Sequence, residues 1–238
     1  MRTVLITGGS RGIGAAAVRA FAGDGWRVAF LYRSHAEAAR ALADETGACA
    51  LACDVGDPAR VRDACAQAAR LLGHIDALIN NAGIAQQKLF TDITDEDWQR
   101  MLAVNLSGAF YVTRAVLPGM ISRKSGRIVN VSSVWGRAGA SCEAHYSAAK
   151  AGLIGLTKAL AKEVGPSGVT VNCVCPGVIQ TDMLGGFSQD DLNALSGETP
   201  LGRLGTPQDV AACLLWLCGE GAAFVTGQTL GVDGGFGQ

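Results

Sequence analysis

The chain has 238 residues, a net charge of −1 and a sequence pI of about 6.3. This balance excludes a strongly basic surface, so we expect no nucleic-acid partner. The longest apolar run, "VAACLLWLC" at 210–218, is about half as long as a membrane-spanning helix, and glycine follows Met1 too early for a signal peptide, so we expect a cytoplasmic protein without a membrane segment.

Short β-branched segments alternate with longer alanine-rich segments along the chain. The expected strands are 3–7, 27–32, 48–53, 76–80, 127–133, 169–174 and 229–233. The expected helices are 12–24, 35–46, 57–72, 95–118, 145–165 and 207–219. Several strands are apolar on both faces, which is typical of buried parallel strands. The pattern predicts an α/β fold: a doubly wound, Rossmann-type parallel sheet of about seven strands with helices on both faces, in a single domain over 1–238.

The least regular segment is 183–206, which is rich in glycine, serine and aspartate. Loops of this length in compact domains are often lids, so we predict a substrate lid here. The eight cysteines are scattered and several stand in apolar runs. They lack the spacing of a metal site and a chain of this length needs no disulfide framework, so we expect buried free thiols and no metal.

A glycine turn, "TGGSRGIG" at 7–14, joins the first strand to the first helix. Glycines let backbone N–H groups approach a pyrophosphate, and a helix N-terminus attracts its charge. Gly8, Gly12 and Gly14 have the spacing G-x-x-x-G-x-G, which is longer than the standard dinucleotide fingerprint. A turn that binds nothing has the same sequence, but this position in the fold indicates a nucleotide site.

The residues after the second strand bear on the choice of nucleotide. A carboxylate there would bind the ribose 2′-hydroxyl of NAD. The sequence reads "LYRSH", with Tyr32 at that position and Arg33 next, while Arg11 stands in the glycine turn. Two guanidinium groups suit a 2′-phosphate, so we predict NADPH rather than NADH. The alternative is that Arg33 is only a solvated surface charge.

The stretch "HYSAAK" at 145–150 places Tyr146 and Lys150 four residues apart, on one face of a helix. Alone, this spacing is more often that of a surface pair, or of a packed tyrosine beside a lysine that extends to solvent. It occurs together with "TGGSRGIG", "NNAG" at 80–83, Asn105 in "VNLSG", "VSS" ending at Ser133 and "PGVIQTDM" at 176–183. In this order the motifs resemble the short-chain dehydrogenase/reductase family over the whole chain. Within the family, the sequence is most similar to 3-oxoacyl-[acyl-carrier-protein] reductases.

The resemblance implies four catalytic residues. Tyr146 would be the general acid, and Lys150 would lower the pKa of Tyr146 and bind the nicotinamide ribose. Ser133 would hold the substrate carbonyl, although it could instead cap a helix, as could Ser132. Asn105 would hold a water in a proton relay to Lys150, or would only shape its helix.

The resemblance also implies an NADPH/NADP site. Asp54 would contact the adenine amine, or would form an Asx turn. Backbone near Ile179, with Thr181, would hold the nicotinamide carboxamide. The expected cofactor-binding residues are Gly8, Ser10, Arg11, Gly12, Ile13, Gly14, Arg33, Asp54, Val55, Asn81, Ala82, Gly83, Tyr146, Lys150, Pro176, Gly177, Ile179 and Thr181.

The expected substrate is a 3-oxoacyl thioester carried by coenzyme A or by an acyl carrier protein. Arg123, Lys124 and Arg127 match part of the family's basic docking patch, whereas Ser167 stands where a second basic residue is expected. Glu143 is a charge where these reductases more often have a neutral side chain, and it could favour a polar or cationic substrate. The alternatives are another ketone, from a sugar, steroid or quinone-like compound, and a nucleotide sensor.

A sensor is expected to have lost Tyr146 or Lys150, and this chain keeps both. Trp135 and Phe187 could line the substrate cleft or serve only in packing. Members of the family are usually homotetramers, so we expect that assembly.

Overall fold

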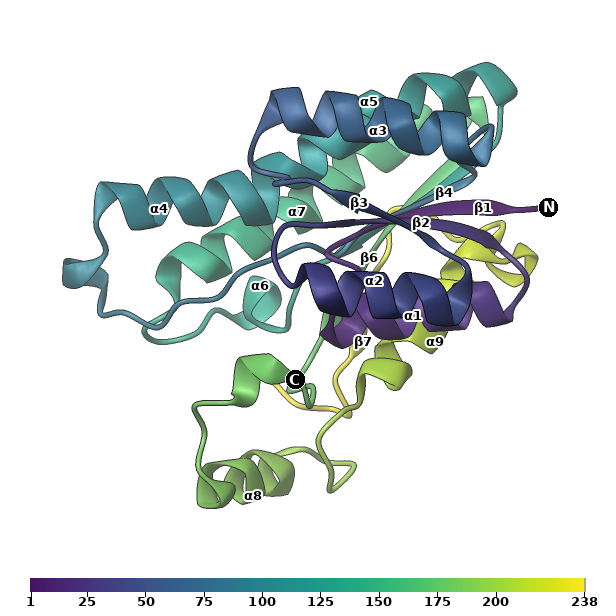
Figure 1. Ribbon diagram of the computed structural model, residues 1–238. Helices are drawn as coiled ribbons and strands as arrows, with labels where there is room; N and C mark the ends of the chain where they lie inside the picture. Colours follow the sequence, from purple (N-terminus) through teal and green to yellow (C-terminus); the bar gives the residue numbers. More distant parts are fainter. Residues whose placement is uncertain (238) are drawn as a thin grey trace.

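The computed structural model describes residues 1–237, with the side chain of Met183 outside the described part. Its sheet has seven parallel strands in the order β3-β2-β1-β4-β5-β6-β7 (Figure 1). The strands are β1 (Thr3–Thr7), β2 (Arg27–Tyr32), β3 (Cys49–Ala52), β4 (Ala77–Asn80), β5 (Gly126–Val131), β6 (Val169–Pro176) and β7 (Thr229–Val232). The predicted doubly wound sheet is confirmed.

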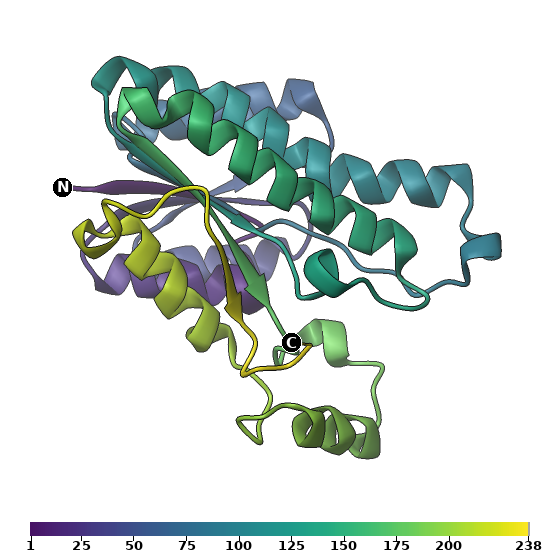
Figure 2. The same ribbon diagram turned by 180° about the vertical axis from the view of Figure 1, so that it is seen from behind.

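Helices cover both faces of the sheet. They are α1 (Gly12–Gly23), α2 (Ala36–Thr46), α3 (Pro58–Leu72), α4 (Asp95–Leu102), α5 (Gly108–Arg123), α6 (Trp135–Ala138), α7 (Ala144–Val164), α8 (Gln189–Glu198) and α9 (Pro207–Cys218). One hydrophobic core joins the sheet to α1, α2 and α9, and a second joins it to α3, α5 and α7. Figure 2 shows α7, in green, crossing the second face.

The alternation of side chains along each strand supplies both cores. On β1, Val4 and Ile6 point into the core under α1, while Leu5 between them points into the other. All three are fully buried. An uninterrupted apolar strand therefore fits a sheet with helices on both sides, as the sequence analysis assumed.

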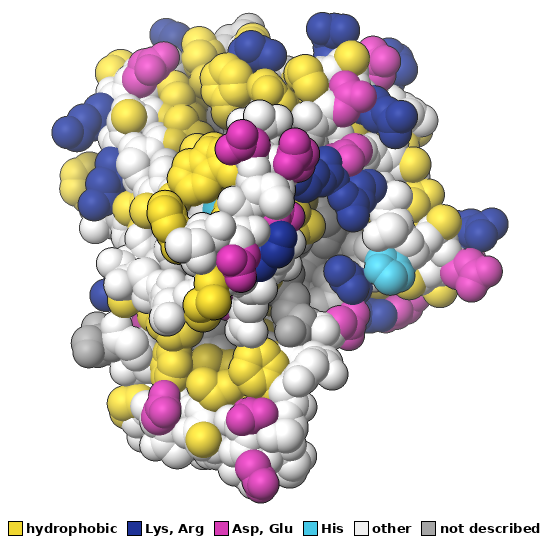
Figure 3. Space-filling view, turned by 90° about the vertical axis from the view of Figure 1, so that its left-hand side faces the viewer, with side chains coloured by type: hydrophobic (Ala, Val, Ile, Leu, Met, Phe, Trp, Pro, Cys, Tyr) yellow, Lys and Arg dark blue, Asp and Glu magenta, His cyan; other side chains and the backbone are white. Residues whose placement is uncertain are grey.

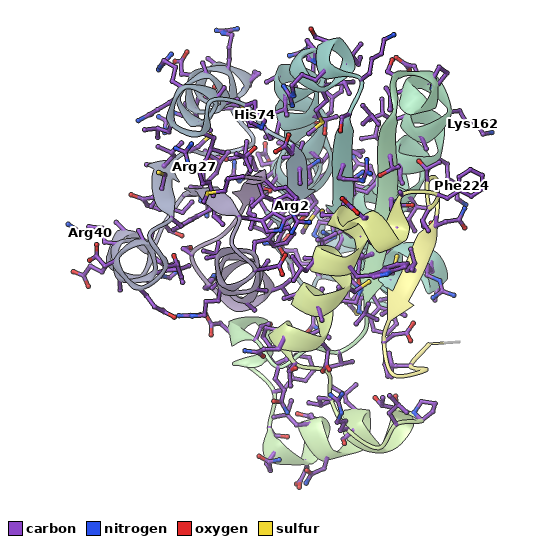
Figure 4. The ribbon with its side chains drawn as sticks, turned by 90° about the vertical axis from the view of Figure 1, so that its right-hand side faces the viewer. Arg2, Arg27, Arg40, His74, Lys162 and Phe224 are labelled. Carbon is purple, nitrogen blue, oxygen red and sulfur yellow. The ribbon has the colours of Figure 1, made fainter. Side chains whose placement is uncertain are left out.

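The chain reverses its direction of travel across the sheet between β3 and β4, so β1 and β4 lie at the switch point. In such sheets the carboxyl ends of the strands border a crevice there. Figure 4 shows the opposite edge, where the strands begin, with Arg2, Arg27 and His74 around it. These side chains bond to neighbouring groups: Arg27, for example, donates to the carbonyl of Leu71 at the end of α3.

Two predicted boundaries are wrong. The helix expected at 95–118 is divided by a π-helical turn, η2 (Ala103–Ser107), and α5 continues through Pro118 to Arg123. The buried side chain of Met120 fixes that last turn against the core, which offsets the hydrogen bond that proline cannot donate.

The segment predicted as a lid, 183–206, includes the last two residues of the short helix η4 (Asp182–Leu184) and all of α8. Ser188 and Asp191 cap α8 by binding each other's backbone N–H groups. The sequence "SQDD" has the pattern of this capping box, so it indicates a helix that the predicted elements do not include. In Figure 1, α8 lies away from the sheet, below the main body of the protein.

The cysteines are all free thiols, of which Cys53, Cys65, Cys173, Cys175 and Cys218 are buried. Among the described residues, no group of His, Cys, Asp and Glu side chains could hold a metal ion. No helix within residues 1–237 is both long and apolar enough to cross a membrane.

Candidate active site

A cleft of about 1110 Å³ opens at the carboxyl ends of the strands. Figure 3 shows this face, with Lys and Arg side chains beside the hollow and acidic side chains on the lobe below it. Of the site residues expected from the sequence, the structure places all but Asn105 on the wall of the cleft. Segments from six different strand ends thus meet in one place.

The glycine turn forms one wall of the cleft. A Cβ atom on Gly14 would lie 2.0 Å from the carbonyl oxygen of Gly8, so only glycine allows this close backbone approach. Asn81, after β4, ties the turn down because its Nδ2 donates to the carbonyls of Thr7 and Gly8 at 3.0 and 3.1 Å. The first turn of α1 therefore faces the cleft with its N–H groups, which suits a pyrophosphate.

The end of β2 offers cationic groups to the cleft. Arg33 lies there with its side chain half exposed, 3.9 Å from a carboxylate oxygen of Asp54. That same oxygen accepts a hydrogen bond from Arg100 on α4 at 3.0 Å. The other oxygen of Asp54 accepts from the N–H of Gly56, so Asp54 does form an Asx turn while it also lines the cleft.

The helix η4 meets the glycine turn through an ion pair. Nη1 of Arg11 lies 3.6 Å from a carboxylate oxygen of Asp182, which begins η4. Both side chains are more than half exposed, so this pair stabilises the arrangement only weakly. Arg11 therefore remains available to an anionic group in the cleft.

Tyr146, Lys150 and Ser133 meet at the ends of β5 and α7. Nζ of Lys150 lies 5.6 Å from the ring centre of Tyr146, which confirms that the two side chains share a helix face. The ammonium donates to the carbonyl of Val131 at 2.8 Å. Ser133 Oγ accepts from the backbone N–H of Trp135 at 3.1 Å, and its side chain also hydrogen-bonds to Tyr146.

The two serines have different partners. Ser132 donates to the backbone carbonyl of Lys150 at 2.7 Å and so fixes α7 to the end of β5. Ser133 accepts a hydrogen bond from the N–H of Trp135, the first residue of α6, and also lines the cleft. Ser133 is therefore bonded at the start of α6 and placed on the cleft wall, and its role toward a substrate stays a prediction.

Burial determines the acid–base behaviour of the pair. It raises the pKa of Tyr146 to about 12, although a hydrogen bond with Ser133 acts in the opposite direction. Burial also lowers the pKa of Lys150 to about 8, since its charge lies in a dry environment. The expected net lowering of the Tyr146 pKa is therefore wrong for this structure, because burial raises that pKa by more than the hydrogen bond with Ser133 lowers it.

Asn105 lies behind the cleft in the π-helical turn and is fully buried. Its side chain donates to the carbonyl of Ile84 at 2.9 Å and accepts from the N–H of Ile84 at 3.0 Å. Gly83 admits this side chain, since a Cβ there would lie 2.7 Å from the Asn105 oxygen and 3.4 Å from Nζ of Lys150. Asn105 thus shapes the wall beside Lys150, and π turns are frequent at functional sites.

The expected carboxamide end of the cleft follows β6. The N–H of Gly177 donates to Val232, and Ile179 pairs with Gly205, so this backbone is fixed by its neighbours. Together with the cradle at Gly14, these features fit a dinucleotide laid across the switch point. Such a cofactor would be held by the glycine turn at one end and by the segment after β6 at the other.

The cleft includes several residues that the sequence analysis did not name for it. They are Gln86, Gln87, Arg100, Val178, Leu184, Asp191 and Leu195, among others. Nothing near Arg100 in the sequence indicates its contact with Asp54, which depends on how α4 packs. Trp135 and Phe187, left open between cleft and packing, both line the cleft.

Comparison with known proteins adds an independent result. A family model described as enoyl-(acyl carrier protein) reductase matches residues 8–237. The chain is 43% identical over 235 residues to an acetoacetyl-CoA reductase of Rhizobium meliloti (strain 1021), with 98% of each chain covered. It is 40% identical over 236 residues to a 3-oxoacyl-[acyl-carrier-protein] reductase of Escherichia coli (strain K12), covering 98% of this chain and 96% of that one.

A solved structure agrees with these relatives. The crystal structure of a 3-oxoacyl-[acyl-carrier protein] reductase from Brucella melitensis matches with a TM-score of 0.91 and 36% identity, over 100% of this chain and 91% of the other. The fold is thus a Rossmann-type α/β fold. The chain belongs to the short-chain dehydrogenase/reductase family, and its relatives mark it as an oxidoreductase acting on CH–OH groups.

Proposed function

We propose that the protein uses NADPH to reduce a 3-oxoacyl thioester to the 3-hydroxyacyl thioester. The observation that carries this proposal is the position of Tyr146 and Ser133 in the same cleft as the glycine turn. One cleft would thereby hold a proton donor and a dinucleotide together. The names of the relatives, acetoacetyl-CoA reductase and 3-oxoacyl-[acyl-carrier-protein] reductase, support the choice of substrate.

The side chains divide the work of reduction. Bound NADPH supplies the hydride. Ser133 would donate its hydroxyl proton in a hydrogen bond to the substrate carbonyl, in place of its hydrogen bond with Tyr146. Tyr146, whose pKa is about 12, is protonated at neutral pH and would give its proton to the oxygen as negative charge develops there.

Lys150 and Asn105 would support this transfer. The ammonium of Lys150 would stabilise the phenolate that Tyr146 becomes, because opposite charges attract strongly in a buried site. Asn105 fixes the backbone of Ile84 and, by our proposal, helps hold the water through which Tyr146 regains its proton.

The choice of NADPH depends on the cations beside the turn. Arg33 and Arg11 both line the cleft and are half exposed, so their guanidinium groups can reach a 2′-phosphate. Tyr32 stands where a carboxylate would bind an unmodified ribose. Asp54 lies 3.9 Å from Arg33, which orients the guanidinium without fully neutralising it.

The carrier of the thioester is a separate question. Arg123, Lys124 and Arg127 lie around the start of β5, whereas Ser133 follows its end, so this basic group is at the other edge of the sheet. Arg123 donates to the carbonyl of Ile75, and Arg127 to that of Gly126. The proposal therefore takes coenzyme A as the first carrier to test and acyl carrier protein as the second.

We also propose a homotetramer located in the cytoplasm. Phe224 is completely exposed at the edge seen in Figure 4, and Phe110 on α5 and Trp216 on α9 are also exposed. Large apolar side chains at a surface are typical of interfaces. Free thiols are typical of a reducing compartment. Light scattering after gel filtration measures the assembly, and a monomeric mass would contradict it.

Initial rates test the proposed reaction. NADPH and NADH oxidation would be followed with acetoacetyl-coenzyme A, with an acetoacetyl carrier protein, and with sugar and steroid ketones. We expect fast reduction of a thioester with NADPH as the preferred cofactor. Turnover of another ketone, with no thioester reduction, would refute the substrate while preserving the role of Tyr146.

A further inference from the structure

The substrate end of the cleft contains a carboxylate that the proposed reduction does not use. Glu143 immediately precedes α7, three residues before Tyr146, and lines the cleft together with Gln87. Its Oε1 accepts a hydrogen bond from Nε2 of Gln87 at 3.4 Å. Within residues 1–237, this is the only polar contact of the Glu143 side chain. A carboxylate can accept about four hydrogen bonds, so most of its capacity is open to a bound molecule.

The loop opposite Glu143 is fixed in place. Both polar atoms of the Gln86 side chain have partners. Its oxygen lies 2.9 Å from Nε2 of His145, and its nitrogen donates to a carboxylate oxygen of Asp97 at 2.9 Å. The backbone N–H of Lys88 donates to the carbonyl of Cys142 at 2.8 Å. Since Gln86 is bound on its far side, Gln87 is the residue of this loop that meets Glu143. A site held by such supporting bonds is suited to recognition.

No cation within the described residues neutralises Glu143. Lys88, the nearest in sequence on the facing loop, is paired with Asp97, and Arg11 faces Asp182. The partly dehydrated position of Glu143 raises its pKa. An unpaired carboxylate in such a place repels an anion and favours a hydrogen-bond donor.

We propose that Glu143, supported by Gln87, forms a subsite that accepts a hydrogen bond from an N–H or O–H donor of the substrate. This inference depends on the proposed reduction of a carbonyl beside Tyr146. In a 3-oxoacyl thioester, the donor is the amide N–H of the pantetheine arm. In a free ketone, it is a hydroxyl two carbons away from the carbonyl carbon.

Matched pairs of substrates test the subsite. The first pair is the acetoacetyl thioester of N-acetylcysteamine and its analogue in which oxygen replaces the amide N–H. The second is 4-hydroxybutan-2-one and 4-methoxybutan-2-one. Binding would be measured by ligand-observed NMR titration on the Tyr146→Phe variant with NADPH, where no turnover is needed. The values of kcat/KM would be measured on the parent enzyme.

We expect the donor-bearing member of at least one pair to bind about tenfold more tightly or better, since hydrogen bonds to charged groups are of that strength. Glu143→Ala should abolish this preference, Glu143→Gln should reduce it, and Glu163→Ala, at an exposed position of the same helix, should leave it unchanged. A preference in the first pair identifies the thioester arm, and one in the second identifies a hydroxyketone.

Failure of the subsite and failure of the proposed function give different results. Equal binding of both members of both pairs, or a preference that survives Glu143→Ala, would overturn the subsite even if thioesters are reduced. A preference that depends on Glu143 in a protein that reduces no carbonyl would overturn the proposed function and leave the subsite standing.

Discussion

Replacement of Lys150 by methionine should change the way that the stability of the protein depends on pH. Lys150 is 3% exposed, and its pKa is lowered to about 8 by burial. Cys173 and Cys175 on the neighbouring strand act in the opposite direction but do not cancel this effect. The folded protein therefore releases the lysine proton more readily than the unfolded chain does.

The sign and size follow from proton linkage. Between pH 8 and the ordinary lysine pKa of 10.5, the unfolded chain binds more protons at this site, so the free energy of unfolding rises with pH. The cost of the buried charge is present in full below about pH 8. From about pH 7 to about pH 9.5, the parent protein should gain about 2 kcal/mol of stability relative to Lys150→Met.

Urea denaturation at several pH values measures this difference. Subtracting the variant removes the contributions of every other group that titrates equally in both proteins. Lys158→Met, at an exposed position of the same helix, serves as the control and should give a difference that is constant with pH. If the parent and Lys150→Met also differ by a constant amount, burial does not perturb Lys150 and the reasoning fails.

Three further changes test the site and the lid. Tyr146→Phe should reduce carbonyl turnover to background while NADPH binding, measured by fluorescence, survives; retained turnover would remove Tyr146 as the acid. Arg33→Asp should weaken NADPH binding more than NADH binding, and an unchanged ratio of the two dissociation constants would exclude the 2′-phosphate contact. Ser188→Ala should destabilise α8 by about 1 kcal/mol. Faster amide hydrogen exchange in 189–198 would show this, whereas unchanged exchange would mean that Asp191 alone holds the helix end.

The sheet could be predicted because its signals are local and repeated. Each apolar segment such as 3–7 is too short for a helix and lies between turn residues, and the alternation with helices leaves few possible topologies. The glycine turn could be placed for the same reason, since it joins the first strand to the first helix. Strand order then brings this turn close to Asn81, which the sequence does not place beside it.

The π turn and the paired charges could not be predicted. No residue pattern in 103–107 distinguishes a π turn from a continuous α-helix, and the structure needs one so that Asn105 reaches the backbone of Ile84. The ion pair of Arg100 with Asp54 joins residues 46 positions apart. Such contacts depend on how α4 packs beside the sheet, which its own sequence does not determine.

Tyr146 and Lys150 show why the spacing of two residues along a helix does not by itself predict their pKa values. An ammonium about 5 Å from a phenol predicts a lowered tyrosine pKa if both groups keep their charges and some water. Burial instead favours the neutral form of each, so it raises the pKa of Tyr146 and lowers that of Lys150. Reduction consumes a proton, and a tyrosine that keeps its proton at neutral pH is in the form that this direction requires. Formation of the phenolate then depends on stabilisation by the ammonium of Lys150. The rate of reduction should therefore fall as the pH rises above about 8 and the charge of Lys150 is lost.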